Sequence, residues 1–524
     1  MSASSFEEKA ERGGTPDDKT YDNSRQSISV VTREGQIVNA SGHKDQLKRQ
    51  YGLLSVCGLA LTIDNAWVAL GGSLTVSILN GGPPGILYEF LTACFYYCFI
   101  AASVAELASS IPSSGGVYHW ASITPGRKWG RTIGYFAGWL NFFGWIFDLA
   151  SIVSIPANVL VEFYRIYHPE LEVQAWHTYV AFLGVTWFGC AICIFANRII
   201  PFIEKFGLFL IIGGGIATIA VVAAVPDTHA SNAFVWKDFV NQTGWPNGVA
   251  FLTGVLNGAF AIGTVDSVTH LAEELPNPRV DLPKAIGAQM ILGTFTGFVY
   301  AIAILYAITD LDAVIGSPGA FPLSEVYAQA TGSTGGTFGL LLIVFLSIMI
   351  CVIGTFLTCG RMWWSLARDN AVPFPGLFSK VNEGLSCPIP ATVFCALLVS
   401  GFGAIALGSK VAFADLVGSF IILTSISFLF AIIPNMVTGR KNVPKGWFWM
   451  GRWGMLINGL AVVFSIFFNI MYCFPYAMPV TPDLMNYNSV ILVGCFLLSL
   501  IWWVVHARKN YPGPLIGSMD IKGQ

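Results

Sequence analysis

The feature that most constrains this chain is a succession of long apolar segments separated by short polar stretches. Most of these segments have the roughly 20 residues that a helix needs to cross a ~30 Å hydrocarbon core. A surface helix of a soluble protein is apolar along one stripe only, so this pattern is not that of a soluble fold. The sequence predicts an all-α integral membrane protein with twelve transmembrane helices. They are expected near residues 53–79, 85–111, 132–163, 176–196, 203–225, 248–271, 284–308, 335–366, 388–407, 413–434, 452–474 and 489–507.

The charged residues support this topology. They make up 11% of the chain, whereas soluble proteins have about 25%. Lys and Arg crowd the loops on one side of the predicted bilayer, and the opposite side keeps only Arg165, Lys237 and Lys410. Because cytoplasmic loops carry the excess of basic residues, we expect both termini in the cytoplasm. The net charge of −2, without a basic stripe, argues against nucleic acid as a partner.

The two ends of the chain differ from its middle. Residues 1–50 are rich in Ser, Glu, Lys and Gly and poor in aromatic residues, which predicts a disordered cytoplasmic tail. Residues 51–508 hold all the apolar segments, and residues 509–524 form a second short cytoplasmic tail. Asn241 begins an Asn-Gln-Thr sequon in a predicted external loop, so we expect glycosylation at this residue.

The first helix carries polar residues at its middle. The sequence there is Thr62-Ile63-Asp64-Asn65, and Trp67 follows two residues later. An Asp at the centre of a spanning helix costs roughly 2.5–3.5 kcal/mol on insertion scales. Asp and Asn also compete with helical hydrogen bonds and favour capping positions. We therefore expect the helix to break here, with Asp64 or Asn65 capping its second half.

The sixth helix has a matching interruption. Asn257, Gly258 and Gly263 weaken it over about residues 258–264, and Asp266 adds a polar group. Two broken helices, five helices apart, are what an inverted five-plus-five repeat requires, with the substrate bound where the helices break. The alternative is that the two glycines only permit close helix packing. The predicted repeats cover about residues 53–225 and 248–434, and two further helices cover about 452–507.

Two motifs carry a family resemblance. One is Ala105-Glu106-Leu107-Ala108 at the end of the second helix, with Pro112, Gly115-Gly116, Tyr118 and Trp120 following it, and the other is Glu273-Glu274-Leu275-Pro276-Asn277-Pro278-Arg279 after the sixth. With them the chain resembles the amino acid–polyamine–organocation superfamily, and within it the fungal branch of choline, GABA and amino-acid permeases. The resemblance covers about residues 50–508. It implies the inverted-repeat fold and proton symport by alternating access.

The chain departs from that family at the first break. Many amino-acid members have a Gly-rich run there, whose bare amides hold the substrate carboxylate. The stretch 62–65 of this chain has Thr, Ile, Asp and Asn instead. The departure leaves room for a substrate that is mainly a cation.

Asp64 is the first candidate for the substrate site. When ionised it can pair with an amine or quaternary ammonium, and when desolvated it can take the coupled proton; the alternative is that it only shapes the break. Trp67 can hold a cation on its ring face, worth up to ~2 kcal/mol when desolvated. The resemblance implies that Phe260 is an aromatic gate over the substrate, and packing is the alternative for both rings. The predicted substrate site is completed by Thr62, Asn65, Asn257, Gly258, Gly263, Trp145 and Cys359.

A second set of residues is predicted to carry the proton or to form a gate. Asp148 lies three residues from Trp145 and therefore on nearly the same helical face, either in a proton relay or in a packing pair. His270 can respond to pH because its reference pKa is near 6.5. The other members of this set are Asp64, Glu106 and Asp266.

The gate is expected at the cytoplasmic ends of helices two and six. Asp266, His270 and Glu273 share one helical face. We expect Glu106 and Asp266 to serve the gate, and Glu273 with Glu274 to lie on a solvated helix end. The basic partners expected for the gate are Arg279, Lys284 or Arg131.

These observations favour a secondary active transporter for choline, GABA or a related amine or amino acid, with the proton as coupling ion. The alternatives are a nutrient sensor on a transporter fold and a carrier for a secondary-metabolite precursor or product. The sequence has no metal cluster, nucleotide loop or catalytic triad, so we expect no cofactor, no metal and no enzymatic activity. The plasma membrane is the expected location, with the vacuolar membrane as the alternative.

Overall fold

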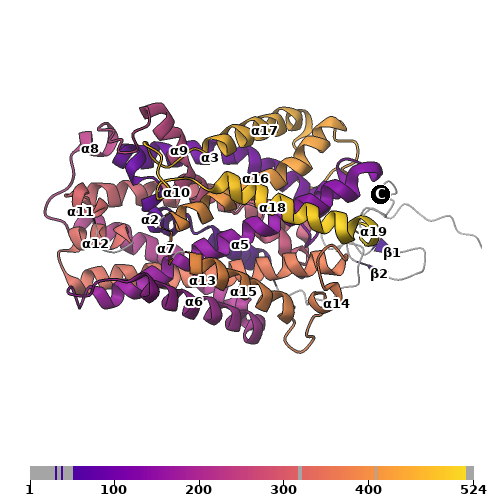
Figure 1. Cartoon of the computed structure of the whole chain (residues 1–524), viewed down its shortest axis with the longest axis horizontal. Helices are drawn as coiled ribbons and strands as arrows, with labels where there is room; N and C mark the ends of the chain where they lie inside the picture. Colours follow the sequence, from indigo (N-terminus) through magenta and orange to yellow (C-terminus); the bar gives the residue numbers. More distant parts are fainter. Residues whose placement is uncertain are drawn as a thin grey trace, which may run out of the picture.

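Helices make up nearly all of the described chain and run along the long axis of the molecule (Figure 1). The strands in the described residues are one antiparallel pair of two residues each, β1 (Val30–Val31) and β2 (Ile37–Val38). The rest of the predicted N-terminal tail and the end of the C-terminal tail lie outside the described residues. The structure, a computed structural model, describes residues 30–31, 37–38, 51–316, 321–405, 407–409 and 411–514.

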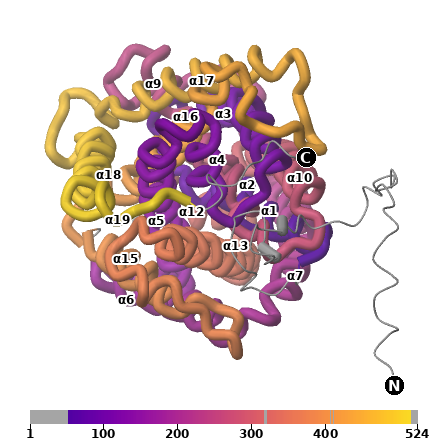
Figure 2. Tube along the Cα trace, turned by 90° about the vertical axis from the view of Figure 1, so that its right-hand side faces the viewer, coloured from indigo at the N-terminus to yellow at the C-terminus, as the bar shows by residue number. Residues whose placement is uncertain are grey.

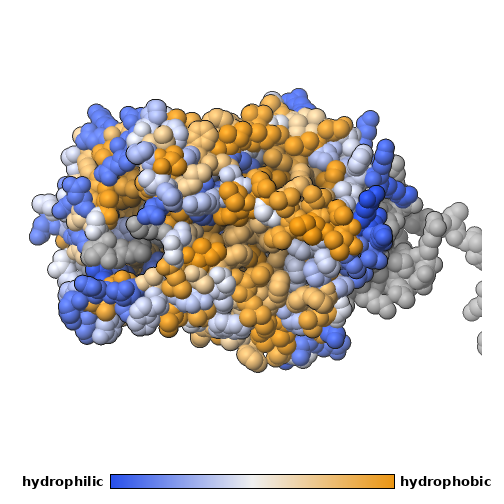
Figure 3. All heavy atoms as spheres, in the orientation of Figure 1, coloured by the Kyte–Doolittle hydropathy of each residue, from blue (hydrophilic) through white to orange (hydrophobic). Residues whose placement is uncertain are grey.

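Eleven helices within these ranges are long and apolar enough to cross a membrane. A further apolar helix, α15 (Ile389–Ile405), is shorter, with 17 residues. Apolar side chains cover a broad middle belt, and hydrophilic ones gather mostly towards the two ends (Figure 3). The expected helical, multi-pass membrane fold is confirmed. The spanning helices are α1 (Leu53–Asp64) with α2 (Ala66–Gly72), α3 (Ile78–Ser110), α5 (Arg127–Arg165), α6 (Ala175–Phe195), α7 (Ile200–Ala224), α9 (Asn247–Ile262), α10 (Pro278–Ala307), α13 (Thr334–Arg368), α16 (Ala412–Val437), α17 (Gly454–Met471) and α18 (Asn488–Trp502).

Short helical turns fill the connections between these spans. They are α4 (Val117–Ile123), α8 (Asn232–Trp236), α11 (Leu311–Ile315), α12 (Pro322–Thr331), α14 (Pro375–Phe378) and α19 (Arg508–Asn510), the 3₁₀ turns η1 (Leu74–Val76), η2 (Asn197–Ile199), η3 (Ser267–Glu274) and η4 (Gly451–Trp453), and the π-helical turn η5 (Trp503–Ala507). The chain after α19 folds back onto the bundle. Tyr511 is buried there, and its hydroxyl lies 2.8 Å from that of Tyr118 in α4.

The bundle has an inner and an outer set of helices. The outer helices α6, α7, α17 and α18 lie on the periphery when the bundle is viewed along its axis (Figure 2). Their apolar windows are mostly exposed, whereas those of α1, α5, α9, α13 and α16 are mostly buried. Polar groups are costly in hydrocarbon, so the inner set is where polar side chains can be placed. The most extensive contacts join α3 with α9 and α5 with α16.

The first spanning helix breaks where the sequence predicts. The first half ends at Asp64, and Asn65 adopts a left-handed conformation with φ 34° and ψ 49°. Asn tolerates this region better than most residues. Asn65 holds the predicted capping position of α2, although its side chain makes no capping hydrogen bond.

The second break begins later than the predicted range 258–264. Helix α9 continues to Ile262, and the chain resumes as η3 only after residue 266. Gly258 stays helical, and a Cβ built on it would lie 2.7 Å from the Cα of Phe90 in α3. Gly258 therefore allows α3 and α9 to approach closely, which is the packing alternative, whereas Gly263 lies in the break itself.

Gly258→Ala should destabilise the protein. The added methyl group collides with the α3 backbone, which cannot move aside, and overpacking of this kind costs typically about 1–3 kcal/mol. We expect a lower melting temperature for the detergent-solubilised variant. Gly248→Ala in the first turn of α9 is the matched control, since its Cβ would meet nothing within 4 Å. Equal melting temperatures for the two variants would contradict the prediction.

Candidate functional site

The two breaks meet at the carboxylate of Asp64. Its Oδ1 accepts a hydrogen bond from the Thr264 hydroxyl at 3.2 Å and from the Gln289 amide of α10 at 3.0 Å. Its Oδ2 lies against α10, where a Cβ at Gly293 would be 2.5 Å away. Asp64 thus ties the first broken helix to the second and to α10, and it is 3% exposed.

Asp148 of α5 is a second carboxylate close to the breaks. It is 1% exposed, and neither oxygen has a hydrogen-bond partner among the described residues. It is close enough to Asp64 and Asp266 to interact with them electrostatically. An isolated ionised carboxylate is very costly to bury. Asp148 therefore needs a proton or a bound cation whenever it is enclosed as it is here.

Aromatic rings surround this part of the molecule. Trp145 precedes Asp148 by one turn, and its ring centroid is 5.8 Å from that of Phe420 in α16. Phe260 of α9 packs edge-to-face against Phe420, with centroids 6.4 Å apart. Tyr97 of α3 also interacts electrostatically with Asp148. The structure thus brings the predicted residues Trp145, Asp148 and Phe260 into one region.

Two of the predicted site residues face away from this region. The ring of Trp67 packs on Tyr300 of α10, with centroids 5.0 Å apart. The hydroxyl of Thr62 donates to the carbonyl of Leu59 at 3.0 Å and to the carboxylate of Glu204 in α7. Both side chains therefore link α1 and α2 to neighbouring helices. Their role in substrate binding stays a prediction.

The remaining predicted residues either lie in the breaks or form hydrogen bonds that join neighbouring helices. Asn257 accepts a hydrogen bond from Ser73, just after α2. Both polar side-chain atoms of Asn65 lack partners among the described residues, so its amide is free to meet a ligand. The Cys359 thiol of α13 donates to the carbonyl of Trp145 at 3.3 Å and so fixes α13 against α5.

Asp266, at the end of the second break, and His270 of η3 belong to one hydrogen-bonded network. Asp266 accepts hydrogen bonds from Asn141 at 3.0 Å and from Trp145 at 3.2 Å. His270 Nε2 lies 3.4 Å from Asp266, and its Nδ1 lies 3.1 Å from the carbonyl of Ser114. Because Trp145 belongs to the aromatic region, this network connects that region to η3.

Buried ion pairs close the same end of the bundle, with partners other than those predicted. Glu273 pairs with Arg368 at 2.9 Å, and Glu274 pairs with Arg361 at 3.1 Å. Glu106 pairs with Arg440, and it also accepts from the Met450 amide at 2.8 Å. The expectation of a solvated end for Glu273 and Glu274 is wrong, since they are 7% and 1% exposed.

Two of the three expected basic partners, Arg131 and Lys284, are engaged elsewhere. Arg131 donates to the carbonyls of Ala507 and Arg508, and Lys284 lies over the ring of Trp447. The actual partners Arg361 and Arg368 are seven residues apart in α13, which is two helical turns. They therefore share the face of α13 that packs on η3.

Reasoning from the sequence missed three functional candidates. For two of them, the burial of the side chain cannot be read from the sequence. Glu204 is 0% exposed, although its place near the start of α7 is typical of a solvated helix end. Gln289 is also 0% exposed, in the fourth turn of α10, and donates a hydrogen bond to Asp64. Glu89 lies inside an apolar run, where a lone carboxylate was a signal that could have been used.

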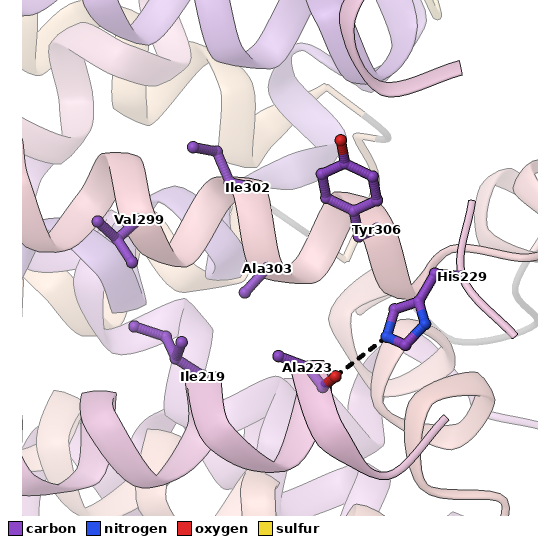
Figure 4. A pocket seen from close by; sticks show the side chains of 7 residues that line it. All are labelled: Ile219, Ala223, His229, Val299, Ile302, Ala303 and Tyr306. Atoms are coloured by element: carbon purple, nitrogen blue, oxygen red, sulfur yellow. Dashed lines mark hydrogen bonds between the residues drawn. The ribbon is translucent and has the colours of Figure 1, made fainter. Parts of the chain in front are cut away.

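Two further features lie apart from the breaks. The side-chain amide of Asn241 donates to the carbonyl of Trp245 at 2.6 Å, and its glycosylation stays a prediction. A cavity of about 350 Å³ lies between α7 and α10, and His229 caps it by a hydrogen bond to the carbonyl of Ala223 (Figure 4). Its lining is mainly apolar and includes no residue of either break: Ile219, Ala223, His229, Val299, Ile302, Ala303 and Tyr306.

Comparison with known proteins identifies the family. Residues 51–496 match the sequence profile of a family described as amino acid permease. The chain belongs to the amino acid permease family. Membership makes it a membrane transport protein of the amino acid–polyamine–organocation superfamily, as the two sequence motifs suggested.

Proteins similar to this permease carry transporter names. The choline transporter of Saccharomyces cerevisiae is 30% identical, over 89% of this chain and 83% of its own length. The transmembrane transporter swnT of Metarhizium robertsii is 28% identical, over 89% and 93%. The amino-acid permease BAT1 of Arabidopsis thaliana is 25% identical, over 94% and 98%.

In this permease both family motifs lie at the ion-paired end. Glu106 belongs to the first motif, and Glu273 and Glu274 belong to the second. Each contributes its carboxylate to a buried ion pair with an Arg from a distant part of the chain. The motifs therefore hold α3 and η3 to α13 and to the segment after α16.

Arg361→Met should destabilise the permease because it leaves Glu274 buried without its partner. Breaking a buried ion pair in this way costs about 3–5 kcal/mol. We expect a lower melting temperature in detergent and a smaller folded fraction. Adding Glu274→Gln should recover much of the loss, since no unpaired charge remains. Arg452→Met, at an exposed residue, is the control and should change neither quantity. An Arg361→Met variant that is as stable as the wild type would contradict a stabilising role for this ion pair.

Proposed function

We propose that this permease is a secondary active transporter that moves a small organic cation of the choline type across the plasma membrane, driven by a proton gradient. The observation that carries the proposal is Asp148. Its carboxylate is buried next to both helix breaks without a hydrogen-bonding or basic partner among the described residues. A cationic solute supplies the missing charge, so the enclosed state becomes favourable only when a cation or proton is present.

The rings around Asp148 favour a quaternary ammonium over a primary amine. Tyr97 interacts with Asp148, Trp145 lies one turn before it, and Phe260 and Phe420 pack in the same aromatic region. Cation–π contact is the usual means of recognising choline-like groups. A primary amine would in addition need several hydrogen-bond acceptors for its N–H groups. The choline transporter among the similar proteins supports the same substrate class.

Asp64 has a different part in this proposal. Its Oδ1 already accepts two hydrogen bonds, from Thr264 and Gln289. It therefore holds the two breaks in register, and its charge adds to the attraction for a cation near Asp148. The Asn65 side chain, which has no partner among the described residues, is available to the hydroxyl of a choline-like solute.

The contacts between helices support an inverted five-plus-five repeat with twelve spans. The second span, α3, packs on the broken sixth one, α9, and the seventh span, α10, packs on the broken first one, α1. The third and tenth spans, α5 and α16, also pack on each other, and so do their counterparts in the other repeat, the eighth and fifth spans α13 and α7. Reciprocal packing of this kind is what a pseudo-two-fold axis between repeats produces. In this arrangement α15 is the ninth span, and both termini lie in the cytoplasm.

Asp148→Asn should abolish choline uptake. The amide keeps the size of the side chain but removes the charge, and losing one partner of a buried charge pair costs roughly 2–5 kcal/mol, so uptake should fall at least about 30-fold. The measurement is uptake of radiolabelled choline at two external pH values in cells that lack their own permeases. Surface biotinylation confirms that the variant reaches the plasma membrane.

Asp312→Asn, at an exposed residue of α11, is the matched control and should transport as the wild type does. The panel also contains GABA, arginine, a polyamine and the alkaloid swainsonine, since one similar protein carries the name of a swainsonine transporter. Uptake by the Asp148→Asn variant at the wild-type rate would exclude Asp148 as counter-ion. A wild-type uptake rate that does not change with the proton gradient would exclude proton symport.

A further inference from the structure

Glu89 of α3 is a carboxylate that the site described above does not use. It is 1% exposed, and neither oxygen has a hydrogen-bond partner among the residues that the structure describes. Gly254 of α9 lies directly against it, because a Cβ at this position would overlap the carboxylate. A Cβ at Gly85, one turn earlier in α3, would lie 3.3 Å from Oε1. Two glycines therefore make the room that this side chain occupies.

The groups that face Glu89 do not neutralise it. Tyr472, just after α17, interacts with it electrostatically, but its hydroxyl lies 3.1 Å from that of Tyr96. From α9 the polar side chains nearest to Gly254 in sequence are Thr253 and Asn257, and neither is titratable. The loop after α8 carries Lys237 and Asp238, and both are exposed. Within the described chain no ion pair reaches Glu89.

Glu89 lies between one end of the bundle and the first break. The amide of Val240 donates to the carbonyl of Gly81 at 3.2 Å, so the loop before α9 covers the start of α3. Gly82 kinks α3 with φ 62°, and Glu89 is seven residues beyond this kink, about 10 Å along a helix at 1.5 Å per residue. On the inner side, Asn257 follows Gly254 by one turn and contacts Ser73, next to α2. Its Nδ2 has no partner among the described residues.

We propose that Glu89 binds and releases the coupling proton; this inference rests on the proton symport proposed above. An ionised carboxylate without a partner cannot be enclosed at low cost, whereas a protonated one can. The packed arrangement of α3 on α9 therefore requires the proton, and loosening of that interface releases it. No bond other than O–H forms or breaks in this step. The proton enters from the side covered by residues 239–242 and stays separate from the solute at Asp148.

The test uses the full-length protein in proteoliposomes, with the membrane potential held at zero. A gradient of one pH unit supports about tenfold accumulation of choline if one proton moves with each solute, since tenfold corresponds to 1.4 kcal/mol. Glu89→Gln keeps the shape of the side chain and removes the titrating group. We expect this variant to exchange choline across the membrane but to accumulate none, because exchange needs no net proton movement.

Glu162→Gln is the matched control, because Glu162 is a buried carboxylate that has a partner, Arg165, at 2.8 Å. It should accumulate choline as the wild type does. Glu89→Asp, which keeps a titrating group, should retain accumulation and serves if Glu89→Gln fails to fold. Accumulation by Glu89→Gln, or loss of exchange by a variant that is folded, would overturn the inference. Wild-type exchange without accumulation would instead reject symport itself, and Glu89 with it.

Discussion

The structure depends on the cost of enclosing a carboxylate away from water. At one end of the bundle the buried glutamates of the two motifs have Arg partners: Glu106 with Arg440, and Glu274 with Arg361. Near the breaks, Asp64 and Asp148 have no basic partner within the described residues. The first arrangement is stable by itself, whereas the second is stable only with a cation or proton. The paired charges therefore stabilise the bundle, whereas the unpaired carboxylates are stabilised by binding a cation or a proton.

The helix breaks bring the unpaired groups to one depth. A continuous first helix would leave no free backbone groups there, because its own hydrogen bonds would use them. The left-handed turn at Asn65 and the gap after Ile262 expose polar groups beside Asp148. Asp64 then joins the two interrupted helices through Thr264. Helices α5 and α16 pack against the interrupted helices and enclose their polar groups with aromatic rings.

The sequence predicted the features that depend on local chemistry. The break at Asp64 and Asn65 was visible because these residues disfavour a helix interior wherever they occur. The gate partners were not visible, because choosing Arg361 over Lys284 requires knowing that α13 packs on η3. Gly258 and Gly263 look alike in the sequence, and only the approach of α3 separates a packing glycine from a break. The role of Asp148 as a substrate counter-ion remains a proposal.

The reciprocal packing of the spans has a consequence for leakage. Asp64 belongs to α1, which packs on α10, and Asp148 belongs to α5, which packs on α16 and α13. Any motion that slides one group of helices over the other changes the distance between two negative charges. Bringing them together without a cation in between costs energy, because like charges in a medium of low dielectric constant repel strongly. In the transport cycle proposed above, an empty carrier with both groups ionised would therefore resist the rearrangement that brings them together, which would limit cycling without solute.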